Sequence, residues 1–345
     1  MGLGTRERPF RRGPLHSLPT APLSAVAFTM PDSLVQTMFD GPIDVIGDVH
    51  GEIDALVSLL RHLGYDEDGR HPEQRRLVFV GDLVDRGPDS PAVVALVQKF
   101  MGAGRAQCVL GNHEFNLLLK EKKLDNHWFF GEASSLDKGH PEEITPAVLA
   151  DVNMRKSLRD FFSSLPLVLE RPDLRVVHAC WDDQMVELAR YATSTKGLYQ
   201  KHFDLIDQRH QESALDKVDR ELEHQNLNPV KLLTSGKEHR TKQTFEAGGK
   251  LRHEKRVEWW KDYQAETLCL FGHYPNDRAK ISKIQLSGRA ICLDFSVGKR
   301  WEDRKRKDFD GKFKGYLAAV RFPERRLVFD DGQEHQLGNE PQTAV

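Results

Sequence analysis

The chain has 345 residues, of which 39% are hydrophobic and 30% are charged, and its formal net charge at pH 7 is −2. This composition excludes collagen-like and wholly disordered chains, and the balanced charge gives no overall basic character of the kind that favours nucleic acid. No stretch approaches the roughly 20 apolar residues that a membrane-spanning helix requires, so we expect no membrane span.

The first forty residues begin with several arginines, which prolines separate from a short apolar run over 23–30. The prolines, and the lack of a clear cleavage site after the run, argue against a signal peptide. We therefore expect residues 1–40 to form a disordered tail. Met30 is an alternative start of translation within it.

An alternation of strands and helices follows this tail. The expected elements are, in order, strand 43–47, helix 52–63, strand 76–81, helix 91–101 and strand 107–110. Strand–helix–strand units of about 30 residues predict a parallel sheet with right-handed crossovers, which makes the fold class α/β.

The second half of the chain is interrupted by a long polar insertion over 181–266, which is helix-prone up to 225 and then indicates a hairpin around Ala247-Gly248-Gly249. Around it we expect helices over 114–123 and most of 143–164, and strands over 174–178, 267–272, 290–294, 316–321 and 325–329. The ordered domain is expected over 41–330, with a flexible tail over 331–345.

Four cysteines, at positions 108, 180, 269 and 292, lie far apart and show no C-x-x-C spacing. Each lies in or beside an apolar run that is predicted to be a buried strand. This pattern favours reduced core thiols in a cytoplasmic protein over a disulfide framework.

Three polar motifs follow the first three predicted strands: Gly47-Asp48-Val49-His50-Gly51, Gly81-Asp82-Leu83-Val84-Asp85-Arg86-Gly87 and Gly111-Asn112-His113-Glu114. Asp82 lies 34 positions after Asp48, and Asn112 lies 30 positions after Asp82. Each interval is close to one strand–helix–strand unit, so the three loops should meet at the carboxyl edge of the sheet, where open α/β sheets bind ligands.

The residue types in these loops are those of a metal site. Carboxylate, imidazole and amide oxygen without thiolate suit divalent ions such as Mn²⁺, Fe²⁺ or Zn²⁺. Two further histidines, His178 and His273, follow predicted strands and enlarge the set. These ligands exceed the needs of one ion, whereas two ions about 3.5 to 4 Å apart that share one carboxylate would use them all and generate a hydroxide nucleophile.

The ordered set GDVHG, GDLVDRG, GNHE, VVHAC and FGH resembles the calcineurin-like metallophosphoesterases, and its first three motifs are most similar to the branch of the serine/threonine protein phosphatases. The likeness covers about 42–179 and 268–294. It implies a four-layer α/β sandwich of mixed β-sheets flanked by helices, with 181–266 as a helical and hairpin insertion near the active site.

The resemblance also implies metal ligands by position. Asp48 and His50 would hold a first ion, Asp82 would bridge, and a second ion would be held by Asn112, His178 and His273. The cofactors would be two divalent metal ions, with Mn²⁺ expected first and Fe, Zn or Mg as alternatives. Since a second histidine is absent after His273, where Tyr274 and Pro275 follow, the first ion would have fewer protein ligands than in many relatives.

Three more residues receive catalytic or binding roles from the resemblance. His113, paired with Asp85, would protonate the leaving oxygen, and Arg86 would clamp the phosphate with its planar fork of donors. Glu114 is interpreted as a supporting residue or a first-turn helix charge rather than a ligand.

The chain departs from the protein phosphatase branch at Leu110, where that branch typically has an arginine that clamps phosphate. Leucine at this place is instead typical of the bacterial dinucleoside tetraphosphatases, although those have Asp where this chain has Glu114. Arg252, Arg256 or Lys261 is a candidate replacement for the missing charge. We interpret the adjacent tryptophans at 259 and 260 as hairpin anchors, and the basic segment 299–314 as a solvated loop.

The expected function is therefore a phosphomonoesterase of the serine/threonine protein phosphatase type that uses a dinuclear centre and metal-bound hydroxide. The alternative is a dinucleoside polyphosphate hydrolase or a polynucleotide phosphatase. The partner would be a phosphorylated substrate, whether a phosphoprotein, a nucleotide or an oligonucleotide end, and there is no dedicated nucleic-acid-binding motif. A non-catalytic scaffold has no support, because every expected ligand is present.

Overall fold

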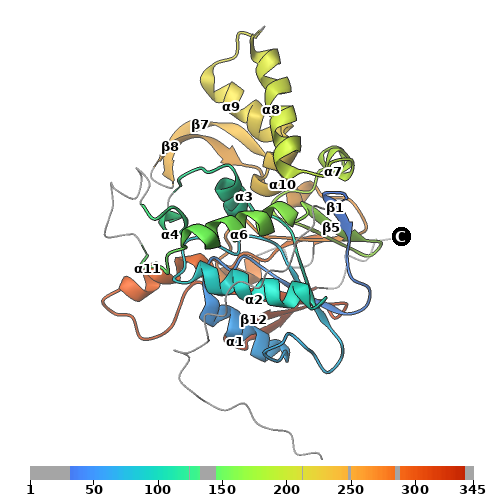
Figure 1. Cartoon of the computed structure of the whole chain (residues 1–345), viewed down its shortest axis with the longest axis vertical. Coiled ribbons are helices and arrows are strands. Elements are labelled where there is room, and N and C mark those ends of the chain that lie inside the picture. The colour runs from blue at the N-terminus through green and yellow to red at the C-terminus, as the bar shows by residue number, and fades with distance from the viewer. Residues whose placement is uncertain are drawn as a thin grey trace, which may run out of the picture.

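The computed structural model describes residues 32–123, 125–132, 145–211, 213–247, 250–283 and 288–338. Two β-sheets form its centre (Figure 1). The six-stranded sheet has the order β13-β12-β11-β2-β3-β4, with strands β2 (Ile43–Ile46), β3 (Arg76–Phe79), β4 (Ala106–Cys108), β11 (Ala318–Phe322), β12 (Arg326–Phe329) and β13 (Glu334–Gln336). Strands β2, β3 and β4 are parallel, as predicted, and Val45 pairs with Val78.

The five-stranded sheet has the order β1-β5-β6-β9-β10, with strands β1 (Val35–Thr37), β5 (Val168–Arg171), β6 (Leu174–Val177), β9 (Leu268–Phe271) and β10 (Ala290–Cys292). The inner faces of the two sheets pack on each other. Val45 and Val78 of one sheet share a buried apolar cluster with Val176, Leu270 and Ile291 of the other.

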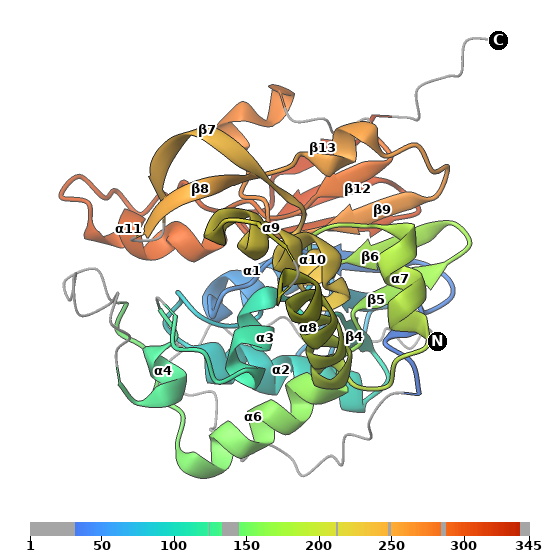
Figure 2. The same cartoon turned by 90° about the horizontal axis from the view of Figure 1, so that it is seen from above.

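Helices cover the outer faces of both sheets (Figure 2). Helices α1 (Ile53–Leu63) and α2 (Ser90–Gly102) lie on the six-stranded sheet, while α7 (Asp183–Arg190) and α10 (Pro229–Ser235) lie against the five-stranded one. Helix α1 buries the leucines at its predicted apolar positions and ends at Gly64, whose φ of 92° is left-handed. The order helix, sheet, sheet, helix confirms the expected four-layer sandwich.

The insertion projects from this body at the top of Figure 1. It contains α7, α8 (Thr195–Gln211), α9 (Lys217–Leu227), α10 and the antiparallel hairpin of β7 (Glu238–Ala247) and β8 (Lys250–Arg256). The expected helices and hairpin are confirmed, although the expected turn at 248–249 lies outside the described residues. A short 3₁₀ helix, η3 (Trp259–Asp262), then returns the chain to β9.

The remaining helices are α3 (Asn112–Leu118), α4 (His127–Phe130), α6 (Val152–Ser164) and α11 (Arg300–Lys305), with 3₁₀ turns η4 (Arg278–Lys283) and η5 (Val297–Lys299). Within the described ranges, no helix is both long enough and apolar enough to cross a bilayer.

Both of the disordered or flexible tails expected from the sequence include residues that the structure places in strands. Strand β1 lies inside the expected tail 1–40 and pairs with β5, and β13 lies inside 331–345 and pairs with β12. Each strand has three residues and gains its stability from a distant partner, so its own sequence carries almost no periodic signal. The parts of the tails at 1–31 and 339–345 are outside the described residues.

Three expected elements also differ. The helix expected over 114–123 begins at Asn112 and ends at Leu118. The helix expected over most of 143–164 begins only at Val152, where Asp151 caps it by accepting the N–H of Met154, while 145–151 is irregular. The basic segment 299–314 is not a solvated loop throughout, because it forms α11. Arg300 there makes a buried ion pair with Asp330 at 2.5 Å, and Arg304 holds buried Glu52.

Candidate active site

The polar motifs meet at the carboxyl edge of the parallel strands, as their spacing predicts. Strands β2, β3 and β4 bring the loops with Asp48, Asp82 and Asn112, while β6 and β9 of the other sheet bring His178 and His273 to the same place. The structure thus brings all six expected metal ligands together at the seam between the two sheets.

Left-handed backbone is concentrated in these loops. His50, Asp82, Asp85, Arg86 and His273 have φ values of 47°, 49°, 68°, 70° and 69°. Such values cost non-glycine residues free energy and persist only where the surroundings hold them, which is typical of functional sites. Close approach also constrains the glycines, because a Cβ on Gly272 would lie 1.9 Å from Oδ1 of Asp48.

The Asp82 carboxylate lies at the centre of the site. Its Oδ2 is 3.3 Å from Nε2 of His178, 3.8 Å from Nε2 of His50 and 3.9 Å from Nε2 of His113. Its other oxygen accepts the backbone N–H of His113 at 3.0 Å. Oδ2 therefore faces both the Asp48–His50 side and the His178–His273 side.

Backbone carbonyls fix the tautomers of two histidines. Nδ1 of His178 lies 2.8 Å from the carbonyl of Val80, and Nδ1 of His50 lies 3.0 Å from the carbonyl of Val84. A carbonyl oxygen only accepts, so each Nδ1 carries a proton, and in the neutral imidazole Nε2 presents a lone pair to the centre of the site. This arrangement is the usual one for a metal-binding imidazole.

The Asn112 side chain completes the second half of the site. Its Oδ1 lies 2.7 Å from Nδ1 of His273 and 3.2 Å from Nε2 of His178. The ligand atoms of Asp82, His178 and His273 all lie within 4.8 Å of one another, as do those of Asp82, His50 and His113. Carboxylate oxygens, imidazole nitrogens and an amide oxygen so close together fit divalent cations.

Negative charge gathers on the Asp48 side. Burial, together with Asp294 and Asp82, raises the pKa of the Asp48 carboxyl well above its usual range. Burial likewise raises the pKa of the Asp294 carboxyl. Removing several carboxylates from water is costly unless a cation neutralises them, so this crowding also fits a metal site.

The histidines respond to the same charges. Burial alone would raise the pKa of the Asp82 carboxyl, but His178 and His113 bring that pKa well below its usual range. Burial alone would lower the pKa of His178, but Asp82 raises it to about 9. Burial, with the Arg86 charge, holds the pKa of His50 well below its usual range.

His113 is held as the family pattern implies. Its Nδ1 donates to Oδ2 of Asp85 at 2.7 Å, which leaves Nε2 facing the centre of the site. Asp85 is fully buried, and its other oxygen accepts the indole N–H of Trp128 from α4 at 2.6 Å. Burial would lower the pKa of His113, but Asp82 and Asp85 raise it. A raised pKa keeps the imidazole able to donate a proton.

Arg86 points its guanidinium at this centre. Its Nη1 donates to Nε2 of His50 at 2.9 Å, and its Nη2 lies 3.3 Å from Nε2 of His113. It is partly exposed, unlike the histidines that it contacts. The contacts of its guanidinium are with imidazole nitrogens rather than carboxylates, so the guanidinium is available to an anion at the site.

Glu114 supports the Asp82 loop. Its carboxylate is fully buried and accepts the backbone N–H groups of Asp82 at 2.9 Å, Leu83 at 2.8 Å and Gly111 at 3.0 Å. This agrees with the interpretation of Glu114 as a supporting residue. The Glu114 side chain therefore connects the loop that contains Asp82 with the loop that begins at Gly111.

Of the three expected replacements for the charge missing at Leu110, Arg256 lies beside the site. Its Nη1 donates to the carbonyl of His273 at 3.1 Å. Arg252 pairs with Glu254 at 3.1 Å, and Lys261 pairs with Glu258 at 2.8 Å at the surface. Only the first of these contacts reaches a motif residue.

The tryptophan pair anchors the insertion, as interpreted from the sequence. Trp259 is buried, its indole N–H donates to the carbonyl of Ala179 at 2.8 Å, and its ring packs on Phe271. Trp260 packs on Phe271 and Tyr274. Both rings therefore hold the returning chain against β9.

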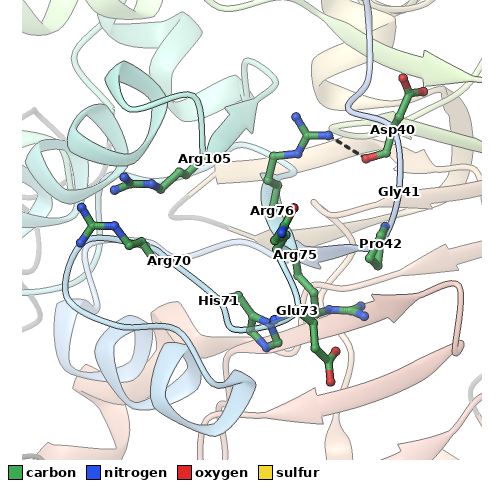
Figure 3. Close-up of a pocket in the computed structure, with 11 residues that line it drawn as sticks. Asp40, Gly41, Pro42, Arg70, His71, Glu73, Arg75, Arg76 and Arg105 are labelled. Atoms are coloured by element: carbon green, nitrogen blue, oxygen red, sulfur yellow. Dashed lines mark hydrogen bonds between the residues drawn. The ribbon is translucent and has the colours of Figure 1, made fainter. Parts of the chain in front are cut away.

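A separate pocket of about 710 Å³ lies at the opposite edge of the sheet, before the starts of β2, β3 and β4 (Figure 3). Its arginines already have partners. Arg75 is bound to Asp44 and Glu324, Arg76 donates to the carbonyl of Asp40 at 2.7 Å, and Arg105 donates to that of Asp68. This pocket contains none of the motif residues.

Two residues of the site were not predicted from the sequence. Asp294 follows β10 and is the last residue of the strand predicted over 290–294, a position that could have revealed it. Trp128 had no such signal, because it lies in a four-residue helix whose contact with Asp85 depends entirely on the tertiary fold.

The model of the calcineurin-like phosphoesterase family matches residues 41–305. An asymmetrical bis(5′-nucleosyl)-tetraphosphatase of Geobacillus thermodenitrificans is 43% identical over 296 residues, which cover 83% of this chain and 92% of that protein. The protein of the same name from Bacillus velezensis is 38% identical over 145 residues, so this alignment covers 39% of the chain and spans only 55% of that relative.

Among solved structures, a cold-active protein-tyrosine phosphatase of a psychrophilic Shewanella superposes with a TM-score of 0.48 at 16% identity, covering 89% of this chain and 82% of that one. The family match extends over most of the chain and includes all five motifs. The chain therefore belongs to the calcineurin-like phosphoesterase family, whose members are phosphoric ester hydrolases.

Proposed function

We propose that this chain hydrolyses phosphate esters or anhydrides with two divalent metal ions at the seam of its sheets. Asp48 and His50 would hold one ion, Asn112, His178 and His273 the other, and Asp82 both. The observation that carries this proposal is the position of Oδ2 of Asp82, within 3.3 to 3.9 Å of Nε2 of three histidines. A lone bridging oxygen among so many donors suits two cations better than one.

Bound divalent ions would polarise the phosphoryl oxygens and lower the pKa of water. The chain's own residues would do the rest. Arg86 would bind two phosphate oxygens with its planar fork. His113 would donate the proton on Nε2 to the leaving oxygen, while Asp85 keeps the proton on Nδ1 and so fixes the direction of the ring.

This assignment requires Arg86 to rearrange. Nε2 of His50 has one lone pair, which accepts Nη1 of Arg86 at 2.9 Å in this structure. The same lone pair cannot also bind a cation. If His50 held a cation through Nε2, Arg86 would give up this contact, and its guanidinium would be free to bind the phosphate.

For the substrate we propose a dinucleoside polyphosphate, such as a dinucleoside tetraphosphate that water cleaves asymmetrically into a nucleoside triphosphate and a monophosphate. The names of the relatives support this choice, as does Leu110, which leaves Arg86 as the single arginine of the motifs. The insertion adds Arg256 beside His273, a further cation for a substrate with several phosphates.

A second candidate is a phosphomonoesterase that acts on phosphoserine or phosphothreonine. The residues of the three motifs favour it, since GDVHG, GDLVDRG and GNHE are most similar to that branch.

Manganese is the ion that we would supply first for either candidate function. Four free buried cysteines favour a reducing compartment, and we propose the cytoplasm.

The deciding experiment compares substrates on protein stripped with EDTA and reloaded with Mn²⁺. We expect faster turnover of diadenosine tetraphosphate, with ATP and AMP as products, than of a phosphoserine peptide. An Asp82→Asn variant serves as the control for contaminating phosphatases. Turnover of the phosphopeptide alone would favour the second candidate, and metal-loaded protein that hydrolyses neither these substrates nor p-nitrophenyl phosphate would refute the hydrolase.

A further inference from the structure

The insertion carries a second cluster of potential metal ligands, far from the motifs in sequence. Helices α8 and α9 pack against each other at the top of Figure 1. Asp207 and His210 of α8 and His224 of α9 each offer a ligand atom, and these three atoms all lie within 4.8 Å of one another. None of these residues belongs to the proposed active site.

The helical positions explain how the ligands come together. Asp207 and His210 are three residues apart on α8, so they share one face of that helix. That face meets α9, which supplies His224 and its neighbour Glu223. The cluster therefore joins two helices through side chains from both.

Two pairs of potential ligand atoms are already close together. Oδ1 of Asp207 lies 3.3 Å from Nε2 of His224, and Oε2 of Glu223 lies 2.9 Å from Nε2 of His210. Ligand atoms about 2.0–2.1 Å from a tetrahedral zinc ion lie about 3.3 Å from each other. A small movement of these side chains would thus let them share one ion.

The surroundings favour an ion over a simple polar contact. His210 is buried, and its ring centre lies 5.1 Å from that of His224. Nδ1 of His224 is buried and has no hydrogen-bond partner among the described residues, while Phe203 stacks on the same ring at 4.4 Å. Two imidazoles with carboxylates are a zinc donor set.

We propose that Asp207, His210, His224 and Glu223 form a second, zinc-type metal site that fastens α8 to α9. Zinc would replace the protons that the two imidazoles share with the carboxylates. Since α8 and α9 both contact α10, which packs on the body, the ion would stiffen the outer part of the insertion. The inference is independent of the proposed function, because it involves none of the motif residues.

The test measures zinc by mass spectrometry on the full chain, stripped and then loaded with Zn²⁺ and desalted. We expect His224→Leu and Asp207→Asn each to bind one zinc ion fewer per chain than the unaltered protein. The matched control is His202→Leu, which removes a histidine from the same helix outside the cluster. Equal zinc contents in all four proteins would overturn the proposal.

Thermal unfolding supplies a second readout. Zinc should raise the unfolding temperature of the unaltered protein and of His202→Leu by more than that of the two cluster variants. Asp207 is exposed, so Asp207→Asn should fold even if His224→Leu does not. Hydrolysis of p-nitrophenyl phosphate by Mn²⁺-loaded Asp207→Asn should match that of the unaltered protein, and the same zinc content with the same thermal shift would again refute the site.

Discussion

Glu114 decides where the Asp82 loop lies, although it does not face the proposed metal ions. Its carboxylate accepts four backbone N–H groups from two loops, those of Asp82, Leu83, Val84 and Gly111. Each donor belongs to a motif, so one buried side chain sets the position of the proposed bridging carboxylate. Such supporting contacts contribute to metal affinity as well as to stability.

We therefore predict that Glu114→Gln weakens metal binding about 10- to 100-fold, because the amide NH₂ group would face backbone donors that now meet an oxygen. Calorimetric titration of the stripped protein with Mn²⁺ would measure the loss. Glu121→Gln, in which the carboxylate belongs to a surface ion pair with Lys123, is the matched control and should bind normally. Unchanged Mn²⁺ affinity in Glu114→Gln would show that the Asp82 loop keeps its position without the Glu114 carboxylate.

His113 should act on the leaving group, and this gives it a specific kinetic signature. We predict that His113→Asn lowers kcat by about 10²- to 10⁴-fold, because the proton on Nε2 is lost. The loss should be larger for phenyl phosphate than for p-nitrophenyl phosphate, since the less acidic phenol depends more on a proton donor. His253→Asn, at an exposed position of β8, is the control. Equal losses on both esters would assign His113 to binding instead.

Whole elements were predicted from sequence wherever one strand or helix carried its own signal. The strand β2 and the helix α1 follow from apolar periodicity, and the three motif loops converge as their spacing predicted. His178 and His273 join them, as expected from their places after predicted strands and from the family resemblance. Strand β1 gave no such signal, because its register depends on β5, more than a hundred residues away. The left-handed backbone conformation of residues such as Asp85 and Arg86 could not be predicted from the sequence either, since tertiary contacts stabilise it.

The importance of β1 can be tested through Leu34, which directly precedes it. Leu34 is fully buried, and its backbone exchanges hydrogen bonds with Ala192 and Leu167. We predict that Leu34→Ala lowers the free energy of unfolding by about 2–5 kcal/mol, the cost of a cavity at a well-packed leucine. Denaturant unfolding would measure it, and Leu149→Ala, at a site that is 57% exposed, should change it little. A small effect at Leu34 would mean that β1 is dispensable.

The hairpin of the insertion delivers its last residue, Arg256, to the site. Its charge is felt there, because after burial it is the next influence that lowers the pKa of His273. We predict that Arg256→Ala raises KM for diadenosine tetraphosphate about tenfold and leaves KM for p-nitrophenyl phosphate nearly unchanged, because only the longer substrate carries further phosphates to contact it. Arg252→Ala, paired with Glu254, is the control. Equal shifts on both substrates would assign Arg256 to the shape of the site.

Across the whole molecule, the proposed metal centre lies where the two sheets meet. The six-stranded sheet supplies Asp48, His50, Asp82 and Asn112, and the five-stranded sheet supplies His178 and His273. The backbone N–H of His273 donates to Asp48 across this seam at 3.0 Å. Cations bound here would therefore connect two layers that otherwise adhere through apolar packing.

We predict that Mn²⁺ raises the free energy of unfolding of the stripped protein by about 2.7 kcal/mol at a concentration 100 times the dissociation constant, because only the folded chain assembles the ligands. Neutralising the crowded Asp48, Asp82 and Asp294 carboxylates works in the same direction. Denaturant titrations with and without Mn²⁺ measure the difference. Asp82→Asn should lose most of it, whereas Asp173→Asn, at an exposed turn, should retain it. A Mn²⁺ effect that survives Asp82→Asn would place the stabilising ions elsewhere in the molecule, whatever the outcome for hydrolysis.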